Sequence, residues 1–161
     1  MPYEAPVADI AFTLKQISGL EGLGRTGAFA AYDSDLIDPI LEEAGKLMRD
    51  VIAPLNQVGD KHGAKLTADG VKAAPGFAQA YQAFREGGWM GLSVPEEWGG
   101  QGLPKVLGLA VMEMLHGANM AFGLCPMLSF GAIEALLAHG TDEQKATYLP
   151  NMVSGQWSGT M

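Results

Sequence analysis

Glu113 and His116 are the pair of side chains in this sequence whose spacing best matches a metal site. A Glu-x-x-His motif places a carboxylate and an imidazole on one helix face, as di-iron helical bundles do. Such a centre also needs a second Glu-x-x-His motif and two further glutamates. The sequence contains no other Glu-x-x-His, so we predict no metal site from this motif.

The remaining side chains that could do chemistry stand alone. His62 has no second histidine or cysteine at metal-ligand spacing, so we expect an ordinary surface histidine. Cys125 is the only cysteine, so no internal disulfide can form. We expect its side chain to act as a small buried hydrophobic group. No Ser/His/Asp arrangement has a credible spacing, so the residues themselves predict no catalytic site.

The segment Gly87 to Pro104, GGWMGLSVPEEWGGQGLP, must be an irregular connection between helices. Its first two glycines end the preceding helix, and Pro95 disfavours helical angles at the residue before it. Trp89 and Trp98 lie within this loop, and they predict that it is packed against the domain.

Apolar residues at helical spacing predict three helices before this loop. They cover Val7 to Ile17, an amphipathic stretch from Asp33 to Val51, and a helix opened by Pro75 with Phe77, Tyr81 and Phe84 on one face. Between the second and third, Asn56 to Ala74 is interpreted as an excursion with turns at GDKHG and TADG.

The helix after Pro104 has almost no polar face, which predicts a place in the middle of a bundle with Leu107, Val111 and Leu115 buried. The uncharged stretch Gly117 to Ile133 approaches the length of a membrane span, but Pro126 would break such a helix. We therefore predict a helical hairpin, with a new helix starting at Pro126, and no membrane span.

Two further signals concern the end of the chain. Thr141 and Gln144 form a capping box for the last helix, which Pro150 is expected to kink or end. The final residues QWSGTM suit the start of a strand.

Length and charge limit the possible roles. A chain of 161 residues suits one domain, and its net charge of −8 excludes the basic face that nucleic acid requires. The N-terminus has no basic region ahead of an apolar one, so we expect no targeting peptide and a cytoplasmic location.

The Gly87 to Pro104 segment resembles the G-x-x-G-x-x-x-P-E-x-x-G-G-x-G signature of the acyl-CoA dehydrogenase family. Other resembling segments follow in order, among them DIAFTL near the start, EMLHGANMAFGLCPMLSFGAIEAL and GTDEQKATYLPNMVSGQWSGTM. Together they cover nearly the whole chain, and they are similar to the long-chain branch that includes methylthiopropionyl-CoA dehydrogenases.

The resemblance implies an all-α helical bundle, truncated at the first strand of a following β-domain. Residues 1–155 would form the N-terminal helical domain, and 156–161 would begin the middle β-domain. The family motif after G-x-W-x-G-T-M carries the flavin-contacting strand, so Met161 would be the first cofactor-binding position. The catalytic glutamate lies in later domains of the family, so we expect this fragment alone to be inactive and to bind no FAD.

For the intact protein, the resemblance implies an FAD-dependent oxidoreductase that removes two hydrogens across the α,β bond of an acyl-CoA. It also implies transfer of the electrons to an electron-transfer flavoprotein, and a homo-oligomer. The acyl pocket of the family is lined by a segment that matches Phe122, Leu124, Met127, Leu128 and Gly131. The alternative is a stand-alone helical interaction module derived from this domain, which the downstream coding sequence would distinguish.

Overall fold

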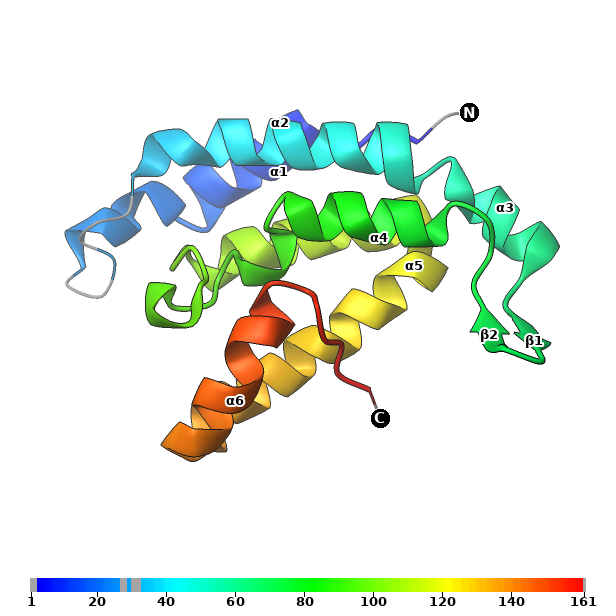
Figure 1. The fold of residues 1–161 in the computed structure, drawn as a ribbon. Coiled ribbons are helices and arrows are strands. Elements are labelled where there is room, and N and C mark those ends of the chain that lie inside the picture. The colour runs from blue at the N-terminus through cyan, green and yellow to red at the C-terminus, as the bar shows by residue number, and fades with distance from the viewer. Residues whose placement is uncertain (1–2, 27–28, 30–32, 161) are drawn as a thin grey trace.

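The structure is a computed structural model that describes residues 3–26, 29 and 33–160. Helices dominate it, and the one sheet among these residues is a two-stranded hairpin (Figure 1). The predicted all-α fold is thus confirmed.

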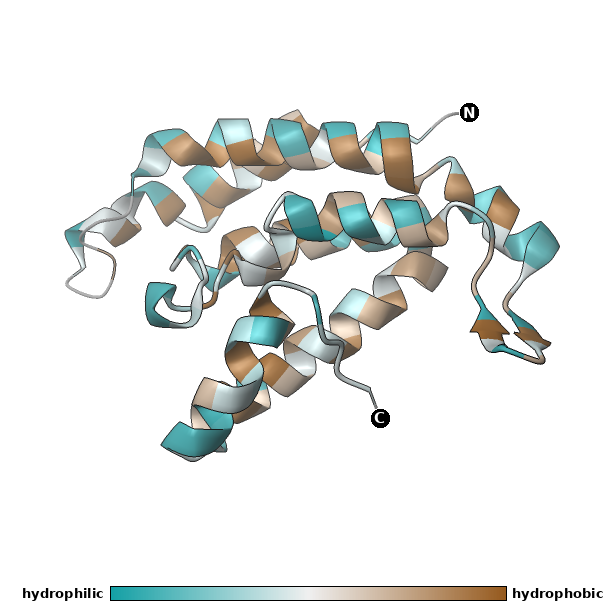
Figure 2. Cartoon of the chain, in the orientation of Figure 1, coloured by the Kyte–Doolittle hydropathy of each residue, from teal (hydrophilic) through white to brown (hydrophobic). Residues whose placement is uncertain are grey.

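The first layer consists of two long helical segments that lie side by side (Figure 1). Helix α1 (Val7–Phe12) continues through a π-helical turn to Ile17, and α2 (Ile37–Leu47) continues through another to Ile52. Both match the predicted helices, and the apolar face of α2, including Ile37 and Leu41, is fully buried. In Figure 2 the hydrophilic residues of α2 follow its outer edge.

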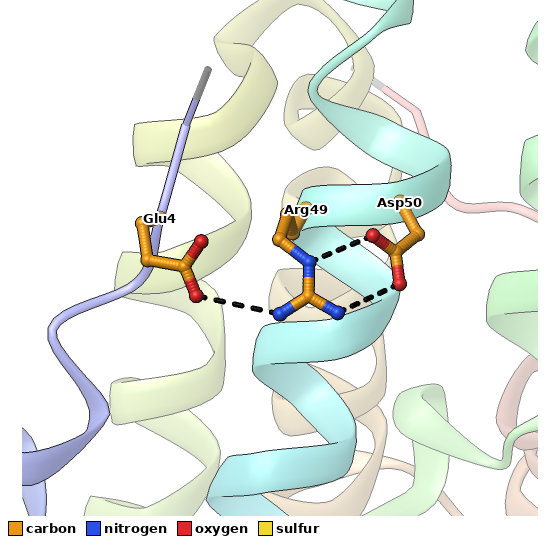
Figure 3. Close-up of polar contacts among 3 residues, drawn as sticks. All are labelled: Glu4, Arg49 and Asp50. Atoms are coloured by element: carbon orange, nitrogen blue, oxygen red, sulfur yellow. Dashed lines mark hydrogen bonds and ion pairs between the residues drawn. The ribbon is translucent and has the colours of Figure 1, made fainter. Parts of the chain in front are cut away.

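Arg49 ties the start of the chain to the end of this layer (Figure 3). Its Nε and Nη2 donate to the two carboxylate oxygens of Asp50 at 2.7 and 2.9 Å, and its Nη1 donates to Glu4 at 3.3 Å. The guanidinium lowers the pKa of Asp50 through these hydrogen bonds. All three side chains are exposed, so the cluster orients the N-terminal segment more than it stabilises the fold.

The excursion predicted from Asn56 to Ala74 is wrong in its first half. Residues Leu55–His62 form helix α3, because Pro54 precedes a helix rather than only closing one. Gly59 lets α3 approach Phe77, whose ring would lie 2.9 Å from a Cβ at that position. The second half is a turn as predicted, joining β1 (Lys65–Thr67) to β2 (Gly70–Lys72).

Helix α4 (Phe77–Glu86) has the predicted apolar face, with Phe84 fully buried, and leads into the glycine-rich loop. That loop folds back on itself, since the amides of Gln101, Gly102 and Leu103 donate to carbonyls of residues 91, 94 and 92. Only glycine fits at position 100, because a Cβ there would lie 2.0 Å from the carbonyl oxygen of Val94 in the folded-back loop. The loop is therefore packed down, as its tryptophans predicted.

Helix α5 (Lys105–His139) is two helical arms joined at Asn119, where φ is −160° and ψ is 94°. The chain reverses there, so residues 105–118 and 120–139 form a V (Figure 1). The Asn119 side chain accepts a hydrogen bond from the amide of Phe122 at 3.1 Å and donates to the carbonyl of Ile52 at 3.4 Å. Asn119 thus acts as the N-cap of the second arm.

The predicted hairpin is therefore present, but the prediction of its turn was wrong. Pro126 lies inside the second arm and does not begin it. By length and composition α5 could cross a membrane, but the reversal at Asn119 prevents it from forming one straight span. Leu107, Val111 and Leu115 are buried as predicted, whereas Leu109 is 67% exposed, so the first arm is not enclosed on every side.

Helix α6 (Asp142–Val153) begins with the predicted capping box. The backbone N–H of Gln144 donates to Oγ1 of Thr141 at 3.2 Å, and the backbone N–H of Thr141 donates to the side-chain Oε1 of Gln144 at 2.9 Å. Pro150 does not end the helix, which continues to Val153. Residues 156–160 form no strand and lie against the second arm of α5.

Candidate functional site

The second arm of α5 presents an open apolar face. Its residues occupy positions i, i+3, i+4 and i+7 of the helix, which lie on one side of the arm: Leu124, Met127, Leu128 and Gly131. Leu124 is 47% exposed and Met127 is 40% exposed. A Cβ on Gly131 would meet no atom within 4 Å, so nothing described in this chain covers that position.

Phe122, the fifth residue predicted for the acyl pocket, lies elsewhere. Its ring packs against Phe77 and Phe84, with ring centres 5.9 and 6.1 Å away, and the residue is only 4% exposed. It belongs to the first turn after Asn119 and closes the core at the elbow of the V.

Ser129 is a residue of this arm whose role the sequence did not indicate. It is fully buried, donates from Oγ to the carbonyl of Cys125 at 3.2 Å, and accepts from the amide of Gly159 at 3.0 Å. Gly159 approaches the arm so closely that a Cβ would lie 2.6 Å from that of Ala132. The C-terminal segment is therefore fastened along the same arm that carries the open apolar face.

A cavity of about 560 Å³ lies between the two arms of α5, closed on one side by α4 and the glycine-rich loop. Large apolar side chains dominate its wall, including Met112, Met127 and Phe130. Lys105 and Glu134 form an ion pair between the arms at the open end of the V. Ser93 Oγ and His116 Nε2, which are buried without a hydrogen-bond partner, also line it.

The groups that could do chemistry remain dispersed in the structure. No set of three His, Cys, Asp or Glu side chains is grouped for a metal ion within the described ranges. His62 is exposed at the end of α3. Cys125 is exposed, so the prediction of a buried side chain was wrong. Partial burial of its thiol still raises the pKa of Cys125, which disfavours the reactive thiolate. Burial, followed by the charge of Glu113, raises the pKa of Tyr3, whose hydroxyl donates to the carbonyl of Met114 at 2.9 Å.

Met161, the predicted flavin contact, lies outside the described residues. Beside the preceding residues is a groove whose lining includes Leu136, Tyr148, Met152 and Trp157. These side chains bring no positive charge, which the diphosphate of a dinucleotide favours. The residues described near the end of the chain therefore do not by themselves fit FAD.

Comparison with known proteins places these features in a family. A family model described as "Acyl-CoA dehydrogenase, N-terminal domain" matches residues 38–156. A 3-methylmercaptopropionyl-CoA dehydrogenase from Ruegeria pomeroyi is 44% identical over 161 residues, which are all of this chain and 27% of that protein. A butyryl-CoA dehydrogenase from Syntrophomonas wolfei is 29% identical over 163 residues, covering 99% of this chain and 27% of the relative. The chain thus spans about a quarter of the length of these curated relatives.

Proposed function

The chain belongs to the acyl-CoA dehydrogenase family as its N-terminal domain, and we propose that it serves a flavin-dependent enzyme that α,β-dehydrogenates an acyl-CoA thioester. When bound to the intact enzyme, FAD would supply the acceptor for the β-hydrogen of the substrate. The base that takes the α-proton lies in later domains of the family, so we assign no catalytic residue to the 161 residues. An electron-transfer flavoprotein as acceptor and a homo-oligomeric enzyme are part of the same proposal.

The role proposed for this domain is to supply one wall of the acyl pocket. The observation that carries it is the open face of Leu124, Met127, Leu128 and Gly131. Exposed apolar residues gathered on one helix face mark a surface that binds something apolar. Each acyl methylene buried there contributes about 0.8 kcal/mol, which makes this face suitable for selecting chain length.

Ser129 has a positioning role in this proposal. Its bond to Gly159 fastens the segment that precedes Met161 to the arm that carries the acyl face. In this proposal the acyl wall and the segment that precedes the predicted flavin contact are both attached to the second arm of α5.

The test is a bulky substitution at Gly131 in the full-length enzyme. Gly131→Phe should reduce kcat/KM for long acyl-CoAs relative to short ones by tens to hundreds of fold, because misfit in an apolar pocket costs about 1 to 3 kcal/mol. Gly22→Phe is the matched control, since a Cβ at that glycine also meets nothing within 4 Å. An equal loss of activity across all chain lengths would contradict the acyl role of this face.

A further inference from the structure

The hairpin formed by β1 and β2 projects beyond α3 at one corner of the molecule (Figure 1). Every residue from 60 to 73 is exposed except Thr67, which is half-buried. Leu66 is 85% exposed and Val71 is 72% exposed, so these apolar side chains take no part in the core. A two-stranded hairpin is marginally stable by itself, so a surface that covers its apolar residues would stabilise it.

The strand register gathers the two apolar side chains on one face of the hairpin. Leu66 is the cross-strand partner of Val71, and partners in an antiparallel pair point to the same side. Lys65 and Lys72 form the neighbouring pair, so their side chains leave from the opposite side. Figure 2 shows hydrophobic residues on both strands. The hairpin therefore has one apolar face and one basic face.

The hairpin is also a positively charged corner of a negatively charged chain. Residues 60–72 contain three lysines, Lys61, Lys65 and Lys72, and two acids, Asp60 and Asp69. Their net charge is +1 with neutral histidine, whereas the whole chain carries −8. None of the three lysines forms an ion pair with another described residue. Two lysines that face each other across the strands repel, so an anionic surface would relieve an unfavourable pair.

The small size of the patch favours a lipid surface over a protein partner. A stable protein interface takes about 20–30 residues from each side, whereas two large apolar side chains stand on this face. A bilayer needs no complementary shape, and each lysine near an anionic bilayer strengthens binding about fivefold. Long lysine side chains can reach past the strands to the lipid phosphates while the apolar face inserts.

We propose that this hairpin docks on an anionic lipid bilayer, with Leu66 and Val71 inserted among the headgroups and the three lysines on the lipid phosphates. The hairpin lies on the membrane surface, and no segment of it crosses the bilayer. Two apolar side chains and three lysines together give an association constant of about 10⁴ M⁻¹, comparable to that of a single acyl anchor, so the docking is reversible. The proposal involves neither the acyl face nor the flavin, so its test is independent of the dehydrogenase function.

The experiment is co-sedimentation of the full-length enzyme with sucrose-loaded vesicles. Vesicles of phosphatidylcholine with about one third phosphatidylserine should pellet the protein, and vesicles of phosphatidylcholine alone should bind it about tenfold or more weakly. Raising the salt to about 1 M, where the Debye length is about 3 Å, should reduce binding to the level seen on the neutral vesicles. Both comparisons use the parent protein and require no variant to fold.

Substitutions on the two faces of the hairpin test the assignment of residues. Val71→Ser should weaken binding to the anionic vesicles by about tenfold, the value of one inserted apolar side chain. Ile17→Ser is the matched control, because Ile17 is also 72% exposed but lies far along the chain, and it should bind as the parent does. Lys65→Gln combined with Lys72→Gln should weaken binding by about 25-fold, and Lys145→Gln on α6 should leave it unchanged.

The same measurements identify any other occupant of the hairpin. No pelleting with anionic vesicles, equal pelleting with neutral ones, or binding unchanged in both hairpin variants would each overturn the proposal. Sedimentation velocity without lipid addresses a second copy of the chain, since a dimer that Val71→Ser abolishes would assign the apolar face to that copy instead. An acidic amphipathic peptide that binds the hairpin more tightly than the vesicles do would assign it to a protein partner and overturn the lipid proposal.

Discussion

Replacing Asn119 by alanine should destabilise the domain more than its single position suggests. The side chain is 1% exposed and makes both hydrogen bonds at the elbow of α5. Loss of an N-cap costs about 0.5–2 kcal/mol. Leaving the buried carbonyl of Ile52 without this donor costs about 1–3 kcal/mol. Because the bond to Ile52 is long at 3.4 Å, we expect a total of about 2–4 kcal/mol.

Urea denaturation followed by circular dichroism measures this loss. In a domain of this size about 2–4 °C of Tm corresponds to each kcal/mol, so thermal melting should move down by about 4–16 °C. Asn119→Ser retains a capping oxygen and should recover part of the loss. Asn56→Ala, at an exposed position of α3, is the matched control and should change stability by less than about 0.5 kcal/mol. A loss below about 0.5 kcal/mol for Asn119→Ala would refute the assignment of Asn119 as the cap that shapes the V.

Three other substitutions test separate parts of the fold. Gly100→Ala should cost several kcal/mol in urea melts, because its Cβ would overlap the Val94 carbonyl, while Gly22→Ala, with open space around its Cβ, should not destabilise the chain. Val111→Asp should cost about 3 kcal/mol or more by placing a charge at a position that is 2% exposed, and a melting point within a degree or two of the parent would contradict a buried first arm. The raised pKa of Tyr3 means that the neutral phenol is favoured by folding, so stability from this group is complete below the unfolded pKa of about 10 and falls as pH rises further. Tyr3→Phe should flatten the stability profile above that pH, and an unchanged slope would argue against burial of the hydroxyl.

Local sequence signals predicted those parts of the fold that depend on neighbours in the chain. The Thr141 capping box and the apolar face of α4 are set by residues a few positions apart, and both were predicted correctly. Helix α3 was missed because Pro54 and Gly59 look like helix breakers, although Pro54 stands before the first turn and Gly59 accommodates Phe77. The turn of the hairpin was placed at Pro126 because proline is the stronger breaker, whereas Asn119 breaks the helix through its capping bond and its long-range bond to Ile52.

The candidate sites also differ in how far neighbouring residues in the sequence predict them. The acyl face came from a family resemblance, and its residues other than Phe122 share one side of a helix, which spacing alone could have indicated. Ser129 meets Gly159, which lies 30 positions later, and no local pattern predicts that bond. Ser93 and His116 are brought to one cavity only by the folding of the loop and the reversal of α5.

Because the two arms of α5 join at Asn119, a change of angle at this residue displaces the far end of the second arm more than its near end. Residues 120–139 span about 30 Å at 1.5 Å per residue. A rotation of about 5° at Asn119 would therefore displace the far end by about 2.6 Å, roughly the size of a water molecule. The ion pair of Lys105 with Glu134 and the bond of Ser129 to Gly159 restrain that rotation at two points along the arm. Small changes at the elbow should therefore be amplified with distance along the arm, so that substitutions far from Leu124 and Gly131 can alter the surface on which those residues lie.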